Sequence, residues 1–404
     1  MRFLVSLAAR NLTRNGRRSA ITLSAIIVGV VVVVVLKGFA DGFIHLVVAS
    51  VVEGRTGALQ VHRAGYFVDR EALPLNLSIT QSPQLEARMS GVAGVKGLSG
   101  RIQFGGLVGD GSSQVTFLGT AIDPSAERRA CPNWGKDLAP GGADLDPEDF
   151  GQGLLGVGLA KSFRAGHLNL SALGPTGRMN AMEISVKGVT ETSLRFENKR
   201  LITVPLRFAQ ELLGMRQQVT EYAIAIEKLG DLDRVAADLS ASLGPQYEVQ
   251  TWREVQPYMY GVVKRQEAIV LISAVIFFSV IVIGIANAMA SSVLERAREV
   301  GTMLAFGMRR SQIVTLFLLE AMMIGTIAGG IGAALGRISV WTIALFGIRV
   351  KQIVTPGDAL VRPEVSLGFT LAVVIAAASV AVLSAALSAL RASRQSPADA
   401  LRSE

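Results

Sequence analysis

This chain of 404 residues is poor in the residues that build metal centres and disulfides. Its single cysteine, Cys131, excludes an internal disulfide and any site with several cysteine ligands, and we interpret it as an inert thiol. The histidines, His45, His62 and His167, lack the spacing of metal ligands, and no HExxH motif or nucleophile elbow occurs. The sequence therefore predicts no metal site and none of the hydrolases that carry those motifs.

Nucleotide-binding motifs are also missing from the sequence. No G-x-x-x-x-G-K-[ST] phosphate loop occurs, since Gly135-Lys136 is followed by Asp137 and lacks the preceding glycines. The glycine-rich run GVGLA at 156–160 has incomplete spacing for a dinucleotide site and predicts a turn into a helix. We expect this chain to bind no cofactor itself and to hydrolyse no ATP.

Charged residues are also scarce in this chain. Charged residues make up 18% of the chain, against about 25% in a typical soluble domain. Half of the residues are apolar, and the mean hydropathy is positive. The net charge of +8 comes from arginines at the ends of apolar runs, without interleaved aromatic residues, so a nucleic-acid partner is not expected. The composition predicts a membrane protein.

Long apolar runs are what the sequence does have, and each is near or above the length that crosses about 30 Å of hydrocarbon. They cover residues 20–36, 268–290, 313–346 and 365–390. Basic residues precede the first run, as in a signal peptide: Arg14, Arg17 and Arg18. That run is longer than a usual signal-peptide core, and no small-x-small cleavage site follows it, so we expect an uncleaved anchor.

The distribution of arginine predicts the orientation of the chain. Arginines lie before the first run, between the second and third, and after the fourth, which places both termini in the cytoplasm. The short loop after the third run also carries Arg349, Lys351 and Arg362, so the bias is imperfect.

More than 200 residues separate the first two runs and predict a folded α+β extracytoplasmic domain. Strand-like stretches occur at 58–62, 102–108 and 114–118, with a hairpin turn at Gly109-Asp110-Gly111. Helix-like stretches follow at 207–215 and 232–243. The fold class expected is a membrane protein with four transmembrane helices and this domain inserted between helices 1 and 2.

Apolar residues continue the first run outward with helical spacing and predict a stalk that packs between subunits. They are Phe39, Phe43, Leu46, Val47, Ser50 and Val51. Three aromatic residues, Trp252, Tyr258 and Tyr260, precede the second run, where an aromatic belt would lie. The alternative is that these side chains only anchor the chain at the lipid interface.

The third run carries two small-xxx-small spacings, which permit close approach of another helix or subunit. Their residues are Gly325 with Gly329 and Gly332 with Gly336. Glu320 lies ten residues past Arg310, roughly 15 Å into the membrane if the membrane starts there, at about 1.5 Å per residue. Because the other ionisable residue within the runs, Arg337, lies 17 residues further along, we interpret Glu320 as a structural hydrogen-bonding group, with Asn287 as its expected neighbour, rather than part of an ion path.

A charged segment at 294–313, LERAREVGTMLAFGMRRSQI, separates the second and third runs. Glu295 with Arg298, and Arg296 with Glu299, are three residues apart and can pair on a helix surface. Two glycines, Gly301 and Gly307, are expected to loosen or end this helix before Arg309 and Arg310. The segment predicts a short, exposed helix on the cytoplasmic side.

This segment resembles the cytoplasmic coupling segment of MacB/FtsX-type ABC transporter permeases, with the pattern ER-x-REIG-x-x-x-A-x-G. The matching residues here are Glu295, Arg296, Arg298, Glu299, Val300, Gly301, Ala305 and Gly307. The N-terminal string at 8–30 resembles the family's amphipathic helix and first span, and the string at 391–402 its C-terminal motif. The stretch 151–190 resembles its extracytoplasmic fold.

The resemblance implies a permease subunit coupled to a separate dimeric ABC-type ATPase, which binds ATP and Mg, and to a second permease, identical or paralogous. The expected location is the bacterial inner membrane. The segment His62–Tyr66 favours a LolC/LolE-like role, in which lipoprotein or a similar amphiphile is extracted from the membrane, with a periplasmic lipoprotein carrier as a further partner. The alternatives are MacB-like export of peptides or amphiphiles, FtsX-like signalling to a cell-wall hydrolase, and a membrane-anchored binding module.

The expected organisation divides the chain into nine parts. They are 1–18, a cytoplasmic amphipathic helix; 19–50, the first transmembrane helix and stalk; 51–250, the extracytoplasmic domain; 251–292, stalk and second transmembrane helix; 293–311, the coupling helix; 312–346, the third transmembrane helix; 347–364, a short outer loop; 365–391, the fourth transmembrane helix; and 392–404, a cytoplasmic tail.

Overall fold

The computed structural model describes residues 7, 10, 16–136, 138–139, 141–163, 166–191, 197–295, 297–351 and 358–393. The chain forms two compact units. The helical unit contains Met1–Ile44, Lys264–Ile348 and Leu360–Glu404, and the sheet unit contains His45–Val263 and Arg349–Ala359. Most of the predicted N-terminal amphipathic helix and of the C-terminal motif lies outside the described residues.

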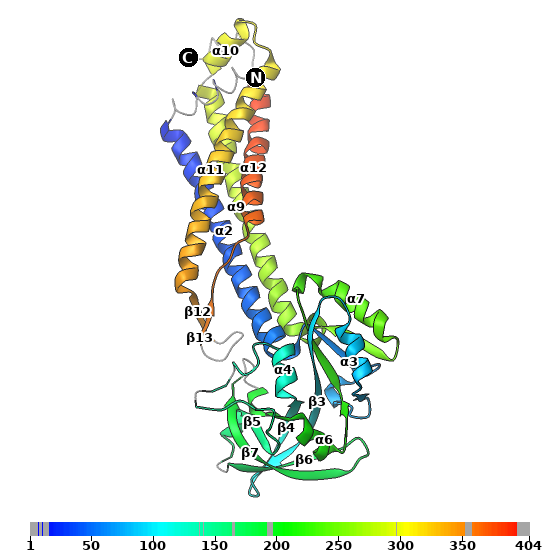
Figure 1. The fold of residues 1–404 in the computed structure, drawn as a ribbon. Coiled ribbons are helices and arrows are strands. Elements are labelled where there is room, and N and C mark those ends of the chain that lie inside the picture. Colours follow the sequence, from blue (N-terminus) through cyan, green and yellow to red (C-terminus); the bar gives the residue numbers. More distant parts are fainter. Residues whose placement is uncertain are drawn as a thin grey trace. The chain divides into compact units, whose positions relative to one another are not determined.

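Within the described residues, four helices are long and apolar enough to cross a membrane (Figure 1). They are α2 (Gly16–Val51), α9 (Pro257–Glu295), α11 (Arg310–Phe346) and α12 (Leu367–Ser393). The 37 residues of α11 measure about 55 Å at 1.5 Å per residue, which exceeds the hydrocarbon thickness. The prediction of four transmembrane helices is confirmed.

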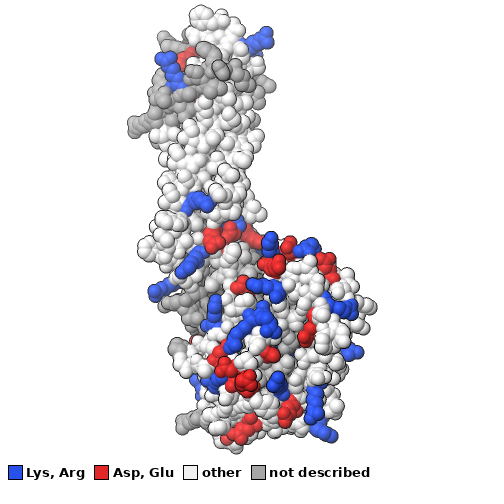
Figure 2. All heavy atoms as spheres, in the orientation of Figure 1, with Lys and Arg blue, Asp and Glu red and all other residues white. Residues whose placement is uncertain are grey.

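The helical unit has an apolar core between its helices and an apolar exterior. Its buried side chains are small or β-branched, including Val30, Val34, Ile281, Ala328 and Ala377. The most apolar stretch of α9 is only 11% buried, against 50% for that of α11. Figure 2 shows a broad band without charged side chains across the bundle, while charged groups gather over the sheet unit. An apolar exterior is what a lipid-facing bundle requires, because lipid cannot solvate charge.

The sheet unit is built on a mixed sheet whose nine described strands have the order β11-β1-β10-β3-β4-β8-β5-β7-β6. The strands are β1 (Leu59–Arg63), β3 (Val95–Gly109), β4 (Gln114–Ile122), β5 (Gln152–Gly156), β6 (His167–Leu173), β7 (Met179–Thr190), β8 (Leu201–Pro205), β10 (Glu221–Ile226) and β11 (Tyr247–Thr251). Strand β8 pairs in parallel with β4, and β5 with β7; the other pairings are antiparallel.

Short helices complete the sheet unit. They are α3 (Pro83–Ser90), α4 (Pro124–Ala130), α5 (Val157–Ala160), α6 (Leu206–Leu213), α7 (Leu232–Leu243) and α8 (Trp252–Val255). Two small ribbons also occur, β2 (Ile79–Thr80) with β9 (Gln218–Val219) and β12 (Ile348–Lys351) with β13 (Asp358–Val361). The α+β prediction is confirmed, with strands and helices at the stretches expected from the sequence.

The predicted hairpin turn forms between β3 and β4. The carboxylate of Asp110 accepts hydrogen bonds from the backbone N–H groups of Ser112 at 2.9 Å and Ser113 at 3.0 Å. Gly111 has φ +89°, which favours glycine because it has no Cβ. The run GVGLA forms the predicted turn into a helix, as the end of β5 followed by α5.

The two faces of the sheet are covered by different helices, and strand alternation decides which side chain meets which cover. On β10, Tyr222 faces α3, where its hydroxyl lies 3.1 Å from Glu86 Oε1. The preceding residue, Glu221, faces the opposite side, where α4 contributes Glu127. Figure 1 shows α3 and α7 together over one face of the unit. The α4 face is polar, which is unusual for the interior of a domain.

Candidate functional site

The segment between the second and third membrane helices forms a helical hairpin. Helix α9 ends at Glu295, α10 covers Ala297–Ala305, and α11 begins at Arg310. Helix α10 continues through Gly301, so Gly301 does not end it. The helix ends just before Gly307, whose φ is +89°. Arg296 and the side chains of Glu295 and Arg298 lie outside what the structure describes, and Glu299 is half-buried.

Helix α10 is fixed to the first turns of α11 by a small apolar cluster. Ile313 and Phe317 are fully buried there. The side chains packed against them are Met303, Leu304, Met308 and Val314. Burying a side chain of this size contributes about 1.5–3 kcal/mol relative to leaving it exposed. This cluster makes α10 and the start of α11 one rigid piece.

A large apolar side chain lies at the tip of this piece. Phe306, between α10 and Gly307, is 92% exposed. Arg309 and Arg310 follow it and are also exposed. Phe317, in the following helix, is buried, so the exposure of Phe306 is not general for phenylalanines of this segment. An exposed phenylalanine beside two arginines is typical of an interaction surface.

The four glycines of the two predicted small-xxx-small spacings lie against two different helices. A Cβ added at Gly325 would lie 2.7 Å from Ala381 Cβ, and one at Gly329 would lie 3.2 Å from Ala377 Cβ, both on α12. On the other side, added Cβ atoms at Gly332 and Gly336 would lie 2.9 Å from Val30 Cβ and 2.8 Å from Val34 Cβ, both on α2. Helix α11 therefore packs closely on both neighbours through backbone that lacks side chains.

The predicted stalk residues lie on a single uninterrupted helix, because α2 continues to Val51. Phe43 and Val47 are buried within the chain, whereas Phe39 and Leu46 are half-buried. The burial of Phe43 and Val47 within one chain contradicts both a position at the lipid boundary and the prediction that these two side chains pack between subunits, because neither has surface left for such a contact. It also leaves Phe39 and Leu46 as the side chains with surface available to another subunit.

The aromatic residues before the second membrane helix divide in a similar way. Trp252 is 4% exposed in α8, and its ring centroid lies 6.0 Å from that of Tyr260. It is therefore a core residue of the sheet unit, and its interpretation as part of an aromatic belt was wrong. Tyr258 is 65% exposed and remains compatible with that belt.

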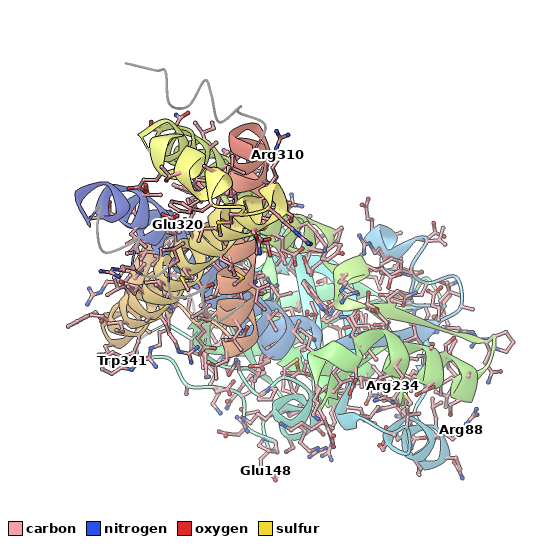
Figure 3. All side chains as sticks on the ribbon, turned by 90° about the horizontal axis from the view of Figure 1, so that it is seen from above. Arg88, Glu148, Arg234, Arg310, Glu320 and Trp341 are labelled. Carbon is pink, nitrogen blue, oxygen red and sulfur yellow. The ribbon has the colours of Figure 1, made fainter. Side chains whose placement is uncertain are left out.

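Glu320 is buried in α11, at 7% exposure, although it lies on a membrane helix. Trp341, further along α11, is 64% exposed and points away from the bundle (Figure 3). The carboxyl group thus lies on the packed side of α11, as a structural role requires. Asn287, its expected neighbour, is exposed on α9, and the pairing stays a prediction.

A buried ionic cluster occupies the α4 face of the sheet unit. The guanidinium of Arg101 donates to both carboxylate oxygens of Glu127, at 3.0 and 2.5 Å, and to the backbone carbonyl of Arg55 at 2.6 Å. It also lies 3.5 Å from Glu221 Oε1, and Glu221 Oε2 lies 4.0 Å from His62 Nε2. Arg101, Glu127, Glu221 and His62 are all less than 5% exposed.

Burial dominates the protonation of these groups. Desolvation raises the pKa of Glu221, and the nearby Arg101 opposes this only in part. Desolvation also lowers the pKa of His62 to about 4, against the opposing charge of Glu248, so its imidazole is neutral at pH 7. It raises the pKa of the Cys131 thiol to about 11, which agrees with an inert thiol.

The sequence analysis missed Phe306 and the buried ionic cluster. Arg101 alternates with Ile102 along a strand, a pattern that predicts a solvent-facing arginine. Its partners come from α4 and β10, the latter 120 residues away, and a single sequence contains no signal for such pairings. Phe306 had a signal, since it is the aromatic residue of a short turn that ends in two arginines.

These features define a class. Four membrane helices, a mixed-sheet domain between the first two, and a short hairpin between the second and third form the architecture of a membrane permease. Family comparison makes the assignment specific. Residues 19–242 match the MacB-like periplasmic core domain, and residues 271–397 match the FtsX-like permease C-terminal region. The chain belongs to the MacB/FtsX-type ABC transporter permeases, proteins of the bacterial inner membrane.

Curated relatives agree with this family. The chain is 27% identical over 368 residues to a macrolide export ATP-binding/permease protein MacB of Nitrobacter winogradskyi, covering 88% of this chain and 55% of that protein. It is 36% identical over 136 residues to the MacB of Hahella chejuensis, covering 33% of this chain and 19% of that protein. The chain thus spans about half the length of the first of these relatives.

Solved structures of two similar proteins each match about half of the chain. They are the extracellular domain of the ABC-type transporter YknZ from Gram-positive bacteria, at 15% identity and a TM-score of 0.35, and the periplasmic region of MacB from Actinobacillus actinomycetemcomitans, at 11% identity and 0.34. They cover 48% and 50% of this chain, and 99% and 92% of those chains.

Proposed function

We propose that this chain is the permease subunit of an ABC transporter and passes ATP-driven motion from an ATPase to its sheet unit. The observation that carries this proposal is the rigid hairpin: α10 is packed onto α11 and presents Phe306, Arg309 and Arg310 at its tip. A force applied to that tip reaches α11 because the apolar cluster leaves no flexible joint between them.

The proposed ATPase is a separate dimeric chain that binds ATP and Mg. The support is the family resemblance of the coupling segment, together with relatives that are named as ATP-binding/permease proteins. The hairpin and both termini would lie in the cytoplasm, as the arginine distribution indicates. A second permease, identical or paralogous, would complete the complex.

The proposed cargo is an amphiphile taken up from the outer leaflet or the periplasm. Lipoprotein extraction is the narrower form of this proposal, as favoured by the segment His62–Tyr66, and would involve a periplasmic carrier. The relatives' name favours a small amphiphile instead, since it describes macrolide export. Reconstituted complexes given a lipidated protein and its unlipidated form would distinguish the two: only ATP-dependent release of the lipidated form supports the narrower proposal.

The docking role of the hairpin can be tested with two exposed phenylalanines that flank α11. Phe306 lies before it and Phe346, at 79% exposure, at its other end. We expect Phe306→Ala to reduce co-purification of the ATPase and stimulated ATP hydrolysis at least tenfold, because it removes the apolar anchor of the tip. Phe346→Ala should leave both unchanged, since it lies at the opposite membrane surface.

Charge reversal at the predicted coupling residues gives a second arm of the same test. The double variant Glu295→Lys, Glu299→Lys should insert normally but uncouple ATP hydrolysis from the permease. Normal assembly and turnover in this variant and in Phe306→Ala would overturn the docking assignment. An effect of Phe346→Ala alone would invert the proposed orientation.

A further inference from the structure

The α4 face of the sheet encloses a cavity of about 660 Å³, within the range of about 300–1,000 Å³ that small-molecule sites occupy. Its floor is a polar surface made by strand register. His62, Glu221 and Arg101 are direct neighbours across β1, β10 and β3. Gln103 of β3 is paired with Thr120 of β4 in the same way. All of these side chains line the cavity.

A polar floor inside a domain needs an explanation, because the other face of the same strands has an ordinary apolar core. Neighbouring positions on β1, β3 and β10 that point to that other face include Val61, Ile102 and Ile224, all fully buried. Replacing apolar packing by charged groups costs desolvation free energy that a structural role does not require. Buried polar groups around a cavity are instead typical of a binding site.

Three polar atoms at this cavity have no hydrogen-bond partner among the described residues. They are Nδ1 of His62, a residue that is 2% exposed, the hydroxyl group of Tyr66, and Nε1 of Trp134. Nε2 of His62 lies 3.3 Å from Gln60 Oε1, which can only accept, so the proton is assigned to Nε2. Nδ1 is then a buried acceptor without a donor, and Trp134 is a donor without an acceptor. Leaving such groups unpaired costs about 1–3 kcal/mol each, which a ligand would relieve.

The charge of the buried floor indicates the charge of the ligand group that it would bind. Two carboxylates, Glu127 and Glu221, face one guanidinium, Arg101. Glu127 takes the two short hydrogen bonds, so Glu221 is left with contacts of 3.5 Å to Arg101 and 3.3 Å to Gln103 Nε2. The remaining charged residues of the lining, Arg55, Arg70 and Glu71, are more exposed than these three. Among the described buried residues of the floor, the carboxyl groups thus outnumber the guanidinium groups by one. Because burial favours the neutral form of Glu221, a bound cation beside it would hold it in the charged form.

We propose that this cavity binds an amphiphile that carries a protonated amine, with the ammonium between Glu221 and His62. The ammonium would donate to the Glu221 carboxylate and to Nδ1 of His62, and a ligand oxygen would accept from Trp134. The apolar body of the ligand would lie against the remaining lining, which includes Leu154 and Leu201. Only the role of this ligand as cargo rests on the proposed function; its binding can be measured without turnover.

The test uses the full chain in lipid nanodiscs and two matched probes. Monodansylcadaverine has a fluorescent apolar group and a primary amine, and its N-acetyl form is the same molecule without the charge. At pH 7.5 we expect the amine to bind at least tenfold more tightly than the acetylated probe. Glu221→Gln should abolish this preference, since it keeps the shape of the side chain and removes its charge.

The matched control is Glu148→Gln, which removes an exposed carboxylate of the same unit, seen at its surface in Figure 3. It should bind both probes as the unchanged protein does. Trp134→Phe keeps an aromatic ring and removes the unpaired N–H, and it should weaken both probes severalfold. Thermal unfolding of each variant shows whether it is folded. Should Glu221→Gln not fold, Trp134→Phe decides alone.

The pH dependence gives an independent reading. Glu221 faces Arg101, Gln103, Glu127 and His62, and its charge also acts on the hydroxyl group of Tyr66. Burial raises the pKa of Glu221, so it loses its charge as the pH falls. The preference for the amine should therefore decline toward acidic pH in the unchanged protein and be absent at every pH in Glu221→Gln.

The proposal is overturned if both probes bind equally, if Glu221→Gln keeps the preference, or if Trp134→Phe binds as the unchanged protein does. Equal signal from all variants and from empty nanodiscs would mean partition into lipid only and would overturn it as well. None of these outcomes affects the Phe306 test, so failure of the site and failure of the proposed function are distinguishable.

Discussion

The close contact between α11 and α12 predicts a graded response to added methyl groups. Alanine at Gly325 would place its Cβ 2.7 Å from Ala381 Cβ and 2.8 Å from Ala378 Cα, below the 3.4 Å of ordinary contact. The helices must then separate locally by about 0.7 Å. Such overpacking costs about 1–3 kcal/mol, because the neighbouring atoms belong to the backbone or are Cβ atoms, which cannot rotate away.

Two neighbouring glycines supply the rest of the series. Alanine at Gly329 would approach Ala377 Cβ at 3.2 Å, a smaller overlap, whereas alanine at Gly330 would meet nothing within 4 Å. We expect the free energy of unfolding to fall most for Gly325→Ala and less for Gly329→Ala. Gly330→Ala should be neutral or gain up to about 1 kcal/mol, since alanine favours a helix over glycine.

The assay is unfolding of the purified protein in mixed micelles of a mild detergent and sodium dodecyl sulfate, followed by circular dichroism. All three variants place the same methyl group within six residues of one helix, so differences in propensity cancel. Equal midpoints for the three variants, or a lower midpoint for Gly330→Ala than for Gly325→Ala, would refute the packing described for α11.

Three further outcomes follow from the structure. Glu127→Gln should lower the free energy of unfolding of the sheet unit by about 3–5 kcal/mol, because it leaves Arg101 buried with only its weaker contact to Glu221. An unchanged thermal midpoint would contradict this. A cysteine at Ser112 should react with a membrane-impermeant thiol reagent applied from the periplasmic side, and a cysteine at Ser311 should not. Background labelling should be low because the native Cys131 is buried. Labelling at Ser311 alone would reverse the topology. A cysteine at Phe39 should crosslink between subunits in some nucleotide states, since that side chain is half-exposed on α2; no crosslink in any state would remove it from the subunit contact.

The sequence predicted the membrane helices and the insertion of the α+β domain because those features depend on long runs and simple periods. The 3.6-residue period of 232–243 and the apolar excess of 313–346 are local properties, and the helices formed where these properties indicated. The glycine spacing of α11 was visible too. The sequence could not show which helix each glycine pair contacts, because Gly325 and Gly332 differ only in the direction they face.

The cavity could not be predicted for a different reason. Its floor joins β1, β3 and β10, and the pairing of β3 with β10 brings together residues 120 positions apart. In one sequence, Glu221 resembles any charged residue at the start of a strand. Only the register shows that it faces Arg101 and His62, and only the cover by α4 shows that all three are buried.

The position of α11 between α2 and α12 has a consequence for how a displacement would spread. Gly325 and Gly329 meet α12, and Gly332 and Gly336, further along the helix, meet α2. Because a glycine has no side chain that could change rotamer, a sideways movement of α11 at these positions would press directly on α12 and, further along, on α2. Helix α2 runs without a break to Val51, so a displacement of one part of it is carried along the length of this one helix.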